Sequence, residues 1–217
     1  MSITTQSVLT LSNNSNNKTP TNPVGVFGFK GYTMERIIRE ITRIMQTKNT
    51  VIIGIDGPCA SGKTTLAKEL AEITEAQLIH TDDFFLPHGL KTPERMAQPG
   101  GNVHYERFYE EVKEGLDSGK LFEYGVYSCA QGRITETKTV IPQGAVIIEG
   151  SYSMHPEMQI PYDLKIFVEA PEEVRLQRIL ERNGEAALEV FKAKWIPLEN
   201  RYFEFFAIKD KCDIIIR

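Results

Sequence analysis

The feature that most constrains the fold is a glycine-rich segment between an apolar run and a helical run. Residues 51–55 are mostly apolar and predict a buried strand. The next residues, Gly57-Pro58-Cys59-Ala60-Ser61-Gly62-Lys63-Thr64, match G-x-x-x-x-G-K-[ST] at every fixed position, and helix formers follow at 65–71. A strand, this loop pattern and a helix in succession predict a phosphate-binding loop, with a chance glycine turn as the alternative.

Each residue type in this loop suits a chain of phosphates. Gly57 and Gly62 let the backbone curve without a Cβ in the way, and a helix N-terminus presents free N–H groups and a positive dipole. Lys63 would place its ammonium on phosphate oxygens, and the Thr64 hydroxyl would ligate Mg²⁺, which prefers hard oxygen ligands. The residues predicted to contact the nucleotide are Gly57, Ala60, Ser61, Gly62, Lys63, Thr64 and Thr65.

Composition bounds the class of protein. The 217 residues are 41% hydrophobic and 25% charged, which suits one globular domain with appendages. The net charge of −4 gives no electrostatic case for a nucleic-acid partner, and the three scattered cysteines predict neither a zinc site nor a disulfide scaffold. We find no apolar run that could span a bilayer and no signal-peptide layout, so we expect a cytoplasmic enzyme without a membrane partner. A homo-oligomer is compatible with the sequence.

Predicted strands alternate with predicted helices along the chain. Strands are expected at 51–55, 76–81, 145–148, 164–168 and 212–216, and helices at 34–46, 65–71, 105–119, 171–182, 185–195 and 197–208. Thr33 is the expected N-cap of the first of these helices. The alternation predicts an α/β fold, a P-loop NTPase-type three-layer α/β/α domain with a mostly parallel, five-stranded sheet.

The chain divides into a tail, a domain and two appended regions. Residues 1–32 are predicted to be a polar tail with a possible edge strand at 24–32, and residues 33–217 form the domain. Within it, 121–128 and 134–141 alternate around a turn and predict a β-hairpin in an inserted lobe, 103–142. Residues 171–195 are the expected lid region, and the irregular stretch 87–102 suits a loop over a site.

Acidic residues follow the ends of two predicted strands. Asp82 and Asp83 follow the second strand, and Glu149 follows the third. Since ligands bind beyond the carboxyl ends of parallel strands, we expect these side chains beside the phosphate loop. Asp82 could take a proton from an attacking hydroxyl or help to hold Mg²⁺, and Glu149 could hold Mg²⁺. The alternatives are turn capping by the aspartates and a structural ion pair for Glu149.

Basic and aromatic residues complete the candidate site. Arg175, Arg178 and Arg182 share one face of a predicted helix, where Arg178 and Arg182 could stabilise the transferring phosphoryl group; the alternative is a solvated face paired with glutamates. In the inserted lobe, Tyr105, Arg107 and Tyr127 suit a flat polar ring and a sugar, although they equally suit ordinary packing.

These motifs together resemble those of the uridine kinase and nucleoside kinase group of P-loop kinases, from about residue 51 to residue 217. IDGPCASGKTT resembles the phosphate loop of the group, TDDFF its second-strand motif, and VIIEG the strand whose glutamate helps to hold Mg²⁺. The resemblance implies that Asp82 is the base and that Thr64, Asp82 and Glu149 surround the metal. It also implies acceptor contacts by Asp83, Phe84 and the GNVHYERF segment, where His104 stands at a position that is commonly Asp in the family.

The sequence therefore predicts an ATP- and Mg²⁺-dependent kinase of a primary hydroxyl, with a nucleoside as the first candidate acceptor. Asp82, Lys63, Arg178 and Arg182 are the predicted catalytic residues. The predicted acceptor contacts are Asp83, Phe84, His104, Tyr105, Arg107 and Tyr127. The alternatives are a kinase of a non-nucleoside acceptor, such as pantothenate, nicotinamide riboside or a sugar phosphate, and a nucleotide-dependent switch outside metabolism.

Overall fold

A computed structural model describes residues 31–217, so the predicted tail and most of the possible edge strand at 24–32 lie outside the described residues. Residues 31 and 32, which that strand would have included, belong instead to helix α1, Gly31–Met45. The prediction that Thr33 caps this helix is therefore wrong. Threonine is tolerated inside a helix, and Ile37 and Ile41, which are fully buried, hold the helix on the sheet whichever residue begins it.

A five-stranded parallel sheet forms the centre of the domain, with the strand order β2-β5-β1-β6-β7. The strands are β1 (Thr50–Asp56), β2 (Gln77–His80), β5 (Gly144–Glu149), β6 (Leu164–Val168) and β7 (Ile214–Ile216). The predicted sheet is confirmed, except that β7 begins later than expected because a 3₁₀ turn, Lys209–Lys211, precedes it.

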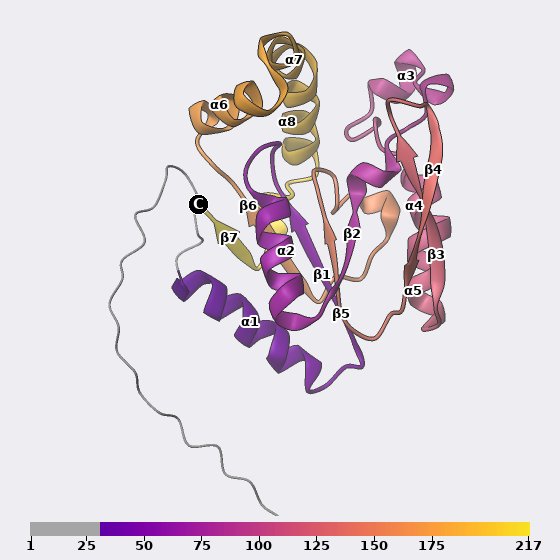
Figure 1. Ribbon diagram of the computed structural model, residues 1–217, viewed down its shortest axis with the longest axis vertical. Coiled ribbons are helices and arrows are strands. Elements are labelled where there is room, and N and C mark those ends of the chain that lie inside the picture. The colour runs from indigo at the N-terminus through magenta and orange to yellow at the C-terminus, as the bar shows by residue number, and fades with distance from the viewer. Residues whose placement is uncertain (1–30) are drawn as a thin grey trace, which may run out of the picture.

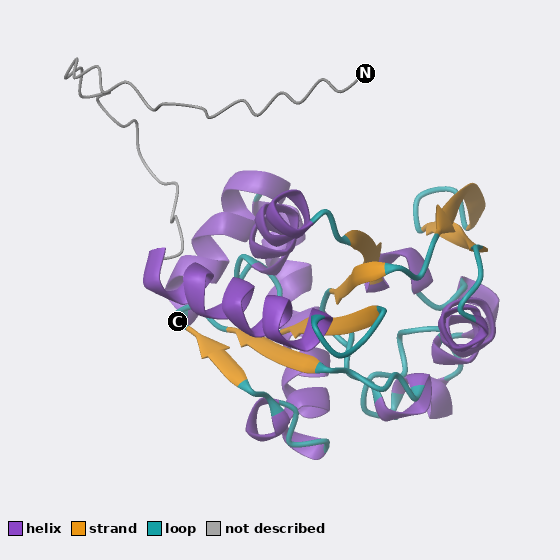
Figure 2. Ribbon diagram, turned by 90° about the horizontal axis from the view of Figure 1, so that it is seen from below, coloured by secondary structure: helices purple, strands orange, loops and turns teal. Residues whose placement is uncertain are grey.

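Helices cover both faces of this sheet (Figures 1 and 2). The helices after α1 are α2 (Lys63–Thr74), α3 (Pro93–Met96), α4 (Tyr105–Phe108), α5 (Glu114–Ser118), α6 (Glu172–Asn183), α7 (Glu185–Val190) and α8 (Ile196–Phe205). On one face Leu66 and Leu70 of α2 pack with Ile53, and on the other Tyr202 of α8 packs in the cluster that contains Ile148. Among the described residues no helix is long and apolar enough to cross a membrane.

The inserted lobe contains a helix and a hairpin. Helices α4 and α5 are continuous through a wide π-helical turn, Tyr109–Lys113, and thus form the single helix expected at 105–119. The antiparallel strands β3 (Phe122–Ser128) and β4 (Arg133–Val140) form the predicted hairpin, with a bulge at Val126/Tyr127. The lobe lies beside β2 at one edge of the sheet (Figure 1).

Helices α6, α7 and α8 lie beyond the end of the sheet from which the phosphate loop leaves β1 (Figure 1). Pro171 occupies the N-cap position of α6, one residue before the position expected for it. A second π-helical turn, Phe191–Trp195, joins α7 to α8 without a break. The helices of the predicted lid region therefore share this end of the sheet with the predicted chemistry.

Candidate active site

The phosphate loop curls around a space that suits an anion. Gly57, Ala60 and Gly62 all have positive φ, at 143°, 58° and 107°. A Cβ on Gly57 would lie 2.1 Å from the carbonyl oxygen of Val168, so only glycine fits there. The Ser61 hydroxyl is buried and has no hydrogen-bond partner among the described residues, as expected of a group that binds a phosphate oxygen.

The Lys63 side chain is nearly buried at the start of α2. Its Nζ donates to the carbonyl oxygen of Pro58 at 2.9 Å and lies 3.4 Å from the Ser151 hydroxyl. Both groups are neutral, so the ammonium keeps its full charge for an incoming phosphate. The lysine therefore stands where the loop motif predicts it.

Glu149 and Thr64 form the oxygen pair expected of a Mg²⁺ site. The Thr64 hydroxyl lies 3.1 and 3.3 Å from the carboxylate oxygens of Glu149, which ends β5 and is 4% exposed. His80 Nδ1 lies 2.5 Å from Oε1 of the same carboxylate and fixes its orientation. Hard oxygen donors from two elements beside a phosphate cradle fit Mg²⁺, which keeps water and phosphate as its other ligands.

Asp82 lies on a 3₁₀ turn, Thr81–Phe84, directly after β2. The Thr81 hydroxyl donates to the carbonyl oxygens of Glu149 and Ser151 at 3.2 and 3.1 Å, which ties this turn to the end of β5. Asp82 is exposed, and it lines the cavity. The protein atoms around this side chain desolvate it and raise its pKa even though the cavity leaves it exposed; Lys63 lowers the pKa in part, and the charge of Glu149 raises it. A carboxylate that holds a proton more tightly than usual is a better base.

One cavity of about 460 Å³ brings these groups together. Ala60, Lys63, Thr64, Asp82, Glu149 and Arg182, all singled out from the sequence, line it. The loop at 87–102 adds His88, Lys91 and Asn102 to the lining, and the lid adds Phe191, Lys194 and Trp195. Phe85, which precedes the loop, and Glu199 of α8 also line the cavity. The anion cradle, the oxygen pair and the aspartate thus face a single space.

The arginines of α6 have separate surroundings. Arg182 lines the cavity, and its Nε donates to Asn183 at 2.8 Å. Arg178 donates to the carbonyl oxygen of Ala60 at 2.8 Å and so lies against the phosphate loop. Arg175 is buried on the far side of the loop and does not line this cavity. Arg182 is therefore the arginine of α6 that faces the cavity, whereas Arg178 and Arg175 contact the phosphate loop, and the roles of Arg178 and Arg182 stay predictions.

The six acceptor contacts predicted by residue do not line the cavity, although Asn102 of the GNVHYERF segment does. Arg107 instead donates to the carbonyl oxygens of Asp83 and Gly125 at 2.5 and 2.7 Å and pairs with Glu111 at 3.1 Å. Asp83 accepts from Lys138 at 2.9 Å and turns toward the hairpin. The Asp83–Lys138 ion pair and the hydrogen bond from Arg107 to Asp83 join the lobe to the turn after β2, and these contacts account for the charged residues of this group.

The remaining four predicted acceptor residues lie outside this cavity, and they fall into two pairs. Phe84 is fully buried, and the ring of Tyr105 stacks on His155 at 4.6 Å. The Tyr127 side chain is buried and its hydroxyl has no partner among the described residues, while His104 precedes α4 and burial lowers its pKa. The buried Nδ1 of His104 likewise has no partner among the described residues. Phe84 and Tyr105 are therefore accounted for by packing, whereas acceptor contact by Tyr127 and His104 stays a prediction.

Two buried residues that line the cavity, Glu199 and Asn102, were not named individually from the sequence, although Asn102 belongs to the GNVHYERF segment whose resemblance implies acceptor contacts. Glu199 is 5% exposed, and its carboxylate accepts from the backbone N–H of Cys59 and from the Ser151 hydroxyl, both at 2.9 Å. Asn102 is 3% exposed, and its Oδ1 has no partner among the described residues. A buried amide oxygen that lines the cavity is suited to accept from a substrate hydroxyl. The GNVHYERF resemblance is the signal for Asn102, whereas a lone acid in the first turn of a helix is the only clue to Glu199.

Replacing Glu199 with glutamine is expected to tighten ADP binding about three- to tenfold, because a negative charge beside the phosphate loop is removed. Glutamine keeps an oxygen that can accept from Cys59 N–H, so the loop keeps its shape. Titration calorimetry with ADP measures the effect, with Glu204→Gln, an exposed acid on the same helix, as the control. Weaker binding in Glu199→Gln, as large as in Glu199→Ala, would contradict this reasoning.

Asp56, the last residue of β1, is a fully buried carboxylate with several donors. It accepts from the backbone N–H groups of Gly57, Tyr152 and Met154 and from the Tyr202 hydroxyl, at 2.7 to 3.1 Å. Burial outweighs these bonds and raises the pKa of Asp56 from 3.8 to about 6. The carboxylate thus fixes the segment that enters the phosphate loop.

The raised pKa of Asp56 predicts a pH-dependent stability. Between pH 4 and 6 the unfolded chain releases this proton while the folded protein retains it, so the contribution of Asp56 to the free energy of unfolding falls as pH rises, by about 3 kcal/mol. Urea unfolding of the wild type and Asp56→Asn across pH 4–7 tests this, because asparagine lacks the titration. Parallel stability curves for the two proteins would contradict it.

The comparisons with known proteins agree with this geometry. The model of the Phosphoribulokinase / Uridine kinase family matches residues 52–187. Among curated relatives, a uridine kinase of Mycoplasma pneumoniae is 30% identical over 79% of this chain and 87% of its own. A uridine kinase of Borrelia turicatae is 29% identical over 76% of this chain and 85% of its own.

A solved structure described as a possible uridine kinase from Bacillus stearothermophilus shares the fold. The TM-score is 0.63 at 19% identity, over 86% of this chain and 100% of that one. The relatives and the family model support a phosphotransferase that acts on an alcohol group. The chain belongs to the Phosphoribulokinase / Uridine kinase family, as its motifs suggested.

Proposed function

We propose that this enzyme transfers the γ-phosphoryl group of ATP, with Mg²⁺, to a primary hydroxyl of a nucleoside. The observation that carries the proposal is the single cavity shared by Lys63, Thr64, Asp82 and Glu149. Relatives named uridine kinase, at 28 to 30% identity, support a nucleoside as the acceptor. ATP as the donor follows from the phosphate loop and the family.

Each side chain has a defined task in this reaction. Lys63 and the loop amides bind the triphosphate, and Thr64 and Glu149 hold Mg²⁺, which neutralises charge on the phosphates when it is bound. Asp82 accepts the proton of the acceptor hydroxyl as that oxygen attacks the γ-phosphorus. Arg178 and Arg182 stabilise the charge on the transferred group from the loop side.

The direct test is ADP release measured with a panel of nucleosides and with no acceptor. We expect ADP release to depend on a nucleoside and the product to gain one phosphate at its primary hydroxyl, as read by mass spectrometry. Slow ADP release that no acceptor stimulates would instead favour the nucleotide-dependent switch.

A second candidate acceptor is a small molecule with an acidic group, such as pantothenate or a sugar phosphate. The cavity wall favours such an acceptor in one respect, because Lys91 and His88 line it and neither side chain forms an ion pair or a side-chain hydrogen bond with another described residue. Preferential turnover of such an acid over uridine, lost in Lys91→Gln, would identify this class.

Replacing Glu149 with glutamine is expected to raise the Mg²⁺ concentration for half-maximal activity about 10- to 100-fold, because one charged metal partner is lost. Mn²⁺ binding to the enzyme–ADP complex, followed by electron paramagnetic resonance, measures the same loss without turnover. Glu136→Gln, on an exposed part of β4, is the control. Unchanged Mn²⁺ affinity in Glu149→Gln would remove this residue from the metal site.

A further inference from the structure

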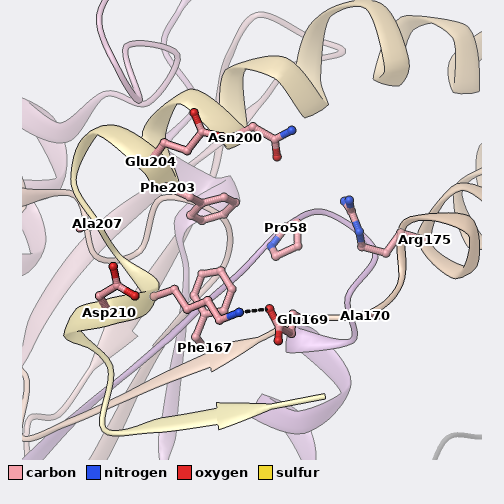
Figure 3. A pocket seen from close by; sticks show the side chains of 11 residues that line it. Pro58, Phe167, Glu169, Ala170, Arg175, Asn200, Phe203, Glu204, Ala207 and Asp210 are labelled. Carbon is pink, nitrogen blue, oxygen red and sulfur yellow. Dashed lines mark hydrogen bonds and ion pairs between the residues drawn. The ribbon is translucent and has the colours of Figure 1, made fainter.

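A second cavity of about 430 Å³ lies behind the phosphate loop, between β6, the start of α6 and helix α8. Figure 3 shows Arg175 at one side of it and the rings of Phe203 and Phe167 at the other, with Pro58 between them. None of the residues predicted to contact ATP, Mg²⁺ or the acceptor lines this cavity. It is therefore separate from the active-site cavity.

The two cavities share a thin wall. Pro58 and Asn200 line the second cavity, whereas their chain neighbours Cys59 and Glu199 line the active site. The backbone of Cys59 is held at both of its polar groups, because Glu199 accepts from its N–H at 2.9 Å and Arg175 Nη1 lies 3.5 Å from its carbonyl oxygen. A change in the position of Arg175 would thus reach the phosphate loop directly.

Arg175 is the group in this cavity that lacks a strong partner. The residue is 6% exposed, and its Nε has no hydrogen-bond partner among the described residues. Its nearest carboxylate oxygen, on Glu172, is 4.0 Å away on a side chain that is 64% exposed. A guanidinium keeps its charge at any physiological pH, and a buried charge is costly without a close counter-ion. Arg175 is therefore suited to bind an anion.

The rest of the cavity selects the kind of anion. Phe167 and Phe203 meet edge to face at 5.3 Å, and with Pro58 they give an apolar wall that suits a flat ring. Lys209 does not compete with Arg175 for an anion, because it pairs with Glu169 at 2.7 Å (dashed in Figure 3). Glu204 and Asp210, both exposed, line the cavity and disfavour a polyanion such as a nucleoside triphosphate.

We propose that this second cavity binds a small organic monoanion, a carboxylate on a planar apolar body, and that its occupation weakens nucleotide binding. The carboxylate would accept a forked pair of hydrogen bonds from Arg175, and the ring would lie on Phe203. Arg175 would then release the Cys59 carbonyl and leave this side of the phosphate loop less firmly held. Because coupling is reciprocal, bound nucleotide would lower the affinity for the monoanion by the same factor.

Benzoate is the probe, titrated into the full chain by calorimetry and by NMR of the labelled protein. We expect Arg175→Gln to weaken benzoate binding at least tenfold, as befits a lost pair of charged hydrogen bonds. Phe203→Leu should weaken it severalfold, and Arg39→Gln, an exposed arginine on α1, should leave it unchanged. Acetate, which lacks the ring, and benzyl alcohol, which lacks the charge, should bind at least tenfold more weakly than benzoate.

Two further results decide the proposal. A saturating ATP analogue should lower the affinity for benzoate severalfold without excluding benzoate. Full competition between the two would place benzoate in the active site and overturn the proposal. Equal affinity for benzoate in the wild type and Arg175→Gln would also overturn the proposal. A higher affinity for inorganic phosphate than for benzoate would overturn it as well. If Arg175→Gln does not fold, Arg175→Lys, which keeps the charge but loses the fork, takes its place with the same expected weakening.

The coupling to nucleotide rests on the proposed function, but benzoate binding does not. Benzoate binding that depends on Arg175, in a protein that phosphorylates no acceptor, would refute the proposed function and retain the site. If the protein phosphorylates an acceptor but shows no benzoate binding that depends on Arg175, the proposed function is retained and the second site is refuted.

Discussion

Replacing Asp82 with asparagine is expected to lower kcat about 100- to 10,000-fold, the usual contribution of a positioned general base. The asparagine fits the same space but cannot take the proton of the acceptor hydroxyl. Nucleotide affinity should change little, because the triphosphate is held by the loop and Lys63. The loss should therefore lie in kcat rather than in the KM for ATP.

Steady-state ADP release with the preferred acceptor measures this split. In the wild type the rate should rise with pH through the raised pKa of Asp82, and this rise should vanish in the variant. Asp83→Asn is the matched control, because its carboxyl faces Lys138 and Tyr124 rather than the cavity. That control should lose stability but keep kcat within a few-fold, and an equal loss in both variants would contradict the assignment of Asp82.

Replacing Lys63 with methionine is expected to lower kcat about 100- to 1,000-fold, the loss seen when one preorganised charge-stabilising donor is removed. Methionine keeps much of the length and the apolar stem. The ammonium also opposes the pKa rise of Asp82, so its loss should leave that carboxyl harder to ionise. The acid limb of the pH–rate profile should accordingly move to higher pH.

Single-turnover phosphoryl transfer across pH 5–9 separates the two effects of the Lys63 change. Lys68 is an exposed lysine on the same helix, α2, and Lys68→Met is the control for loss of charge alone. A reduced rate with an unchanged pH profile would support the contact of Lys63 with phosphate, but it would contradict the effect of Lys63 on the pKa of Asp82. A normal rate would remove Lys63 from catalysis.

The sequence was sufficient for the parts of the site that lie at the carboxyl ends of parallel strands. The loop after β1, Asp82 after β2 and Glu149 at the end of β5 converge because the sheet is parallel and the topology leaves no other arrangement. A motif and a strand order thus determine where these side chains meet.

The acceptor side was not predictable in the same way. Arg107 and Tyr105 have the chemistry of substrate contacts, yet one lies over the Phe84 ring at 4.2 Å and the other stacks on His155. The direction of each depends on the packing of the lobe, which no local pattern encodes. Glu199 was missed for a related reason, since helix α8 reaches the cavity through tertiary contacts such as that of Tyr202 with Asp56.

A crystal structure of the protein with Mg²⁺ and a non-hydrolysable ATP analogue tests the shared cavity most directly. We predict that the triphosphate lies in the 57–64 loop against Lys63 and that the metal lies between Thr64 and Glu149. The Asp82 carboxyl should face the γ-phosphate, with enough space between the two for the hydroxyl of an acceptor. A triphosphate bound elsewhere, or an Asp82 carboxyl turned away from the γ-phosphate, would contradict it.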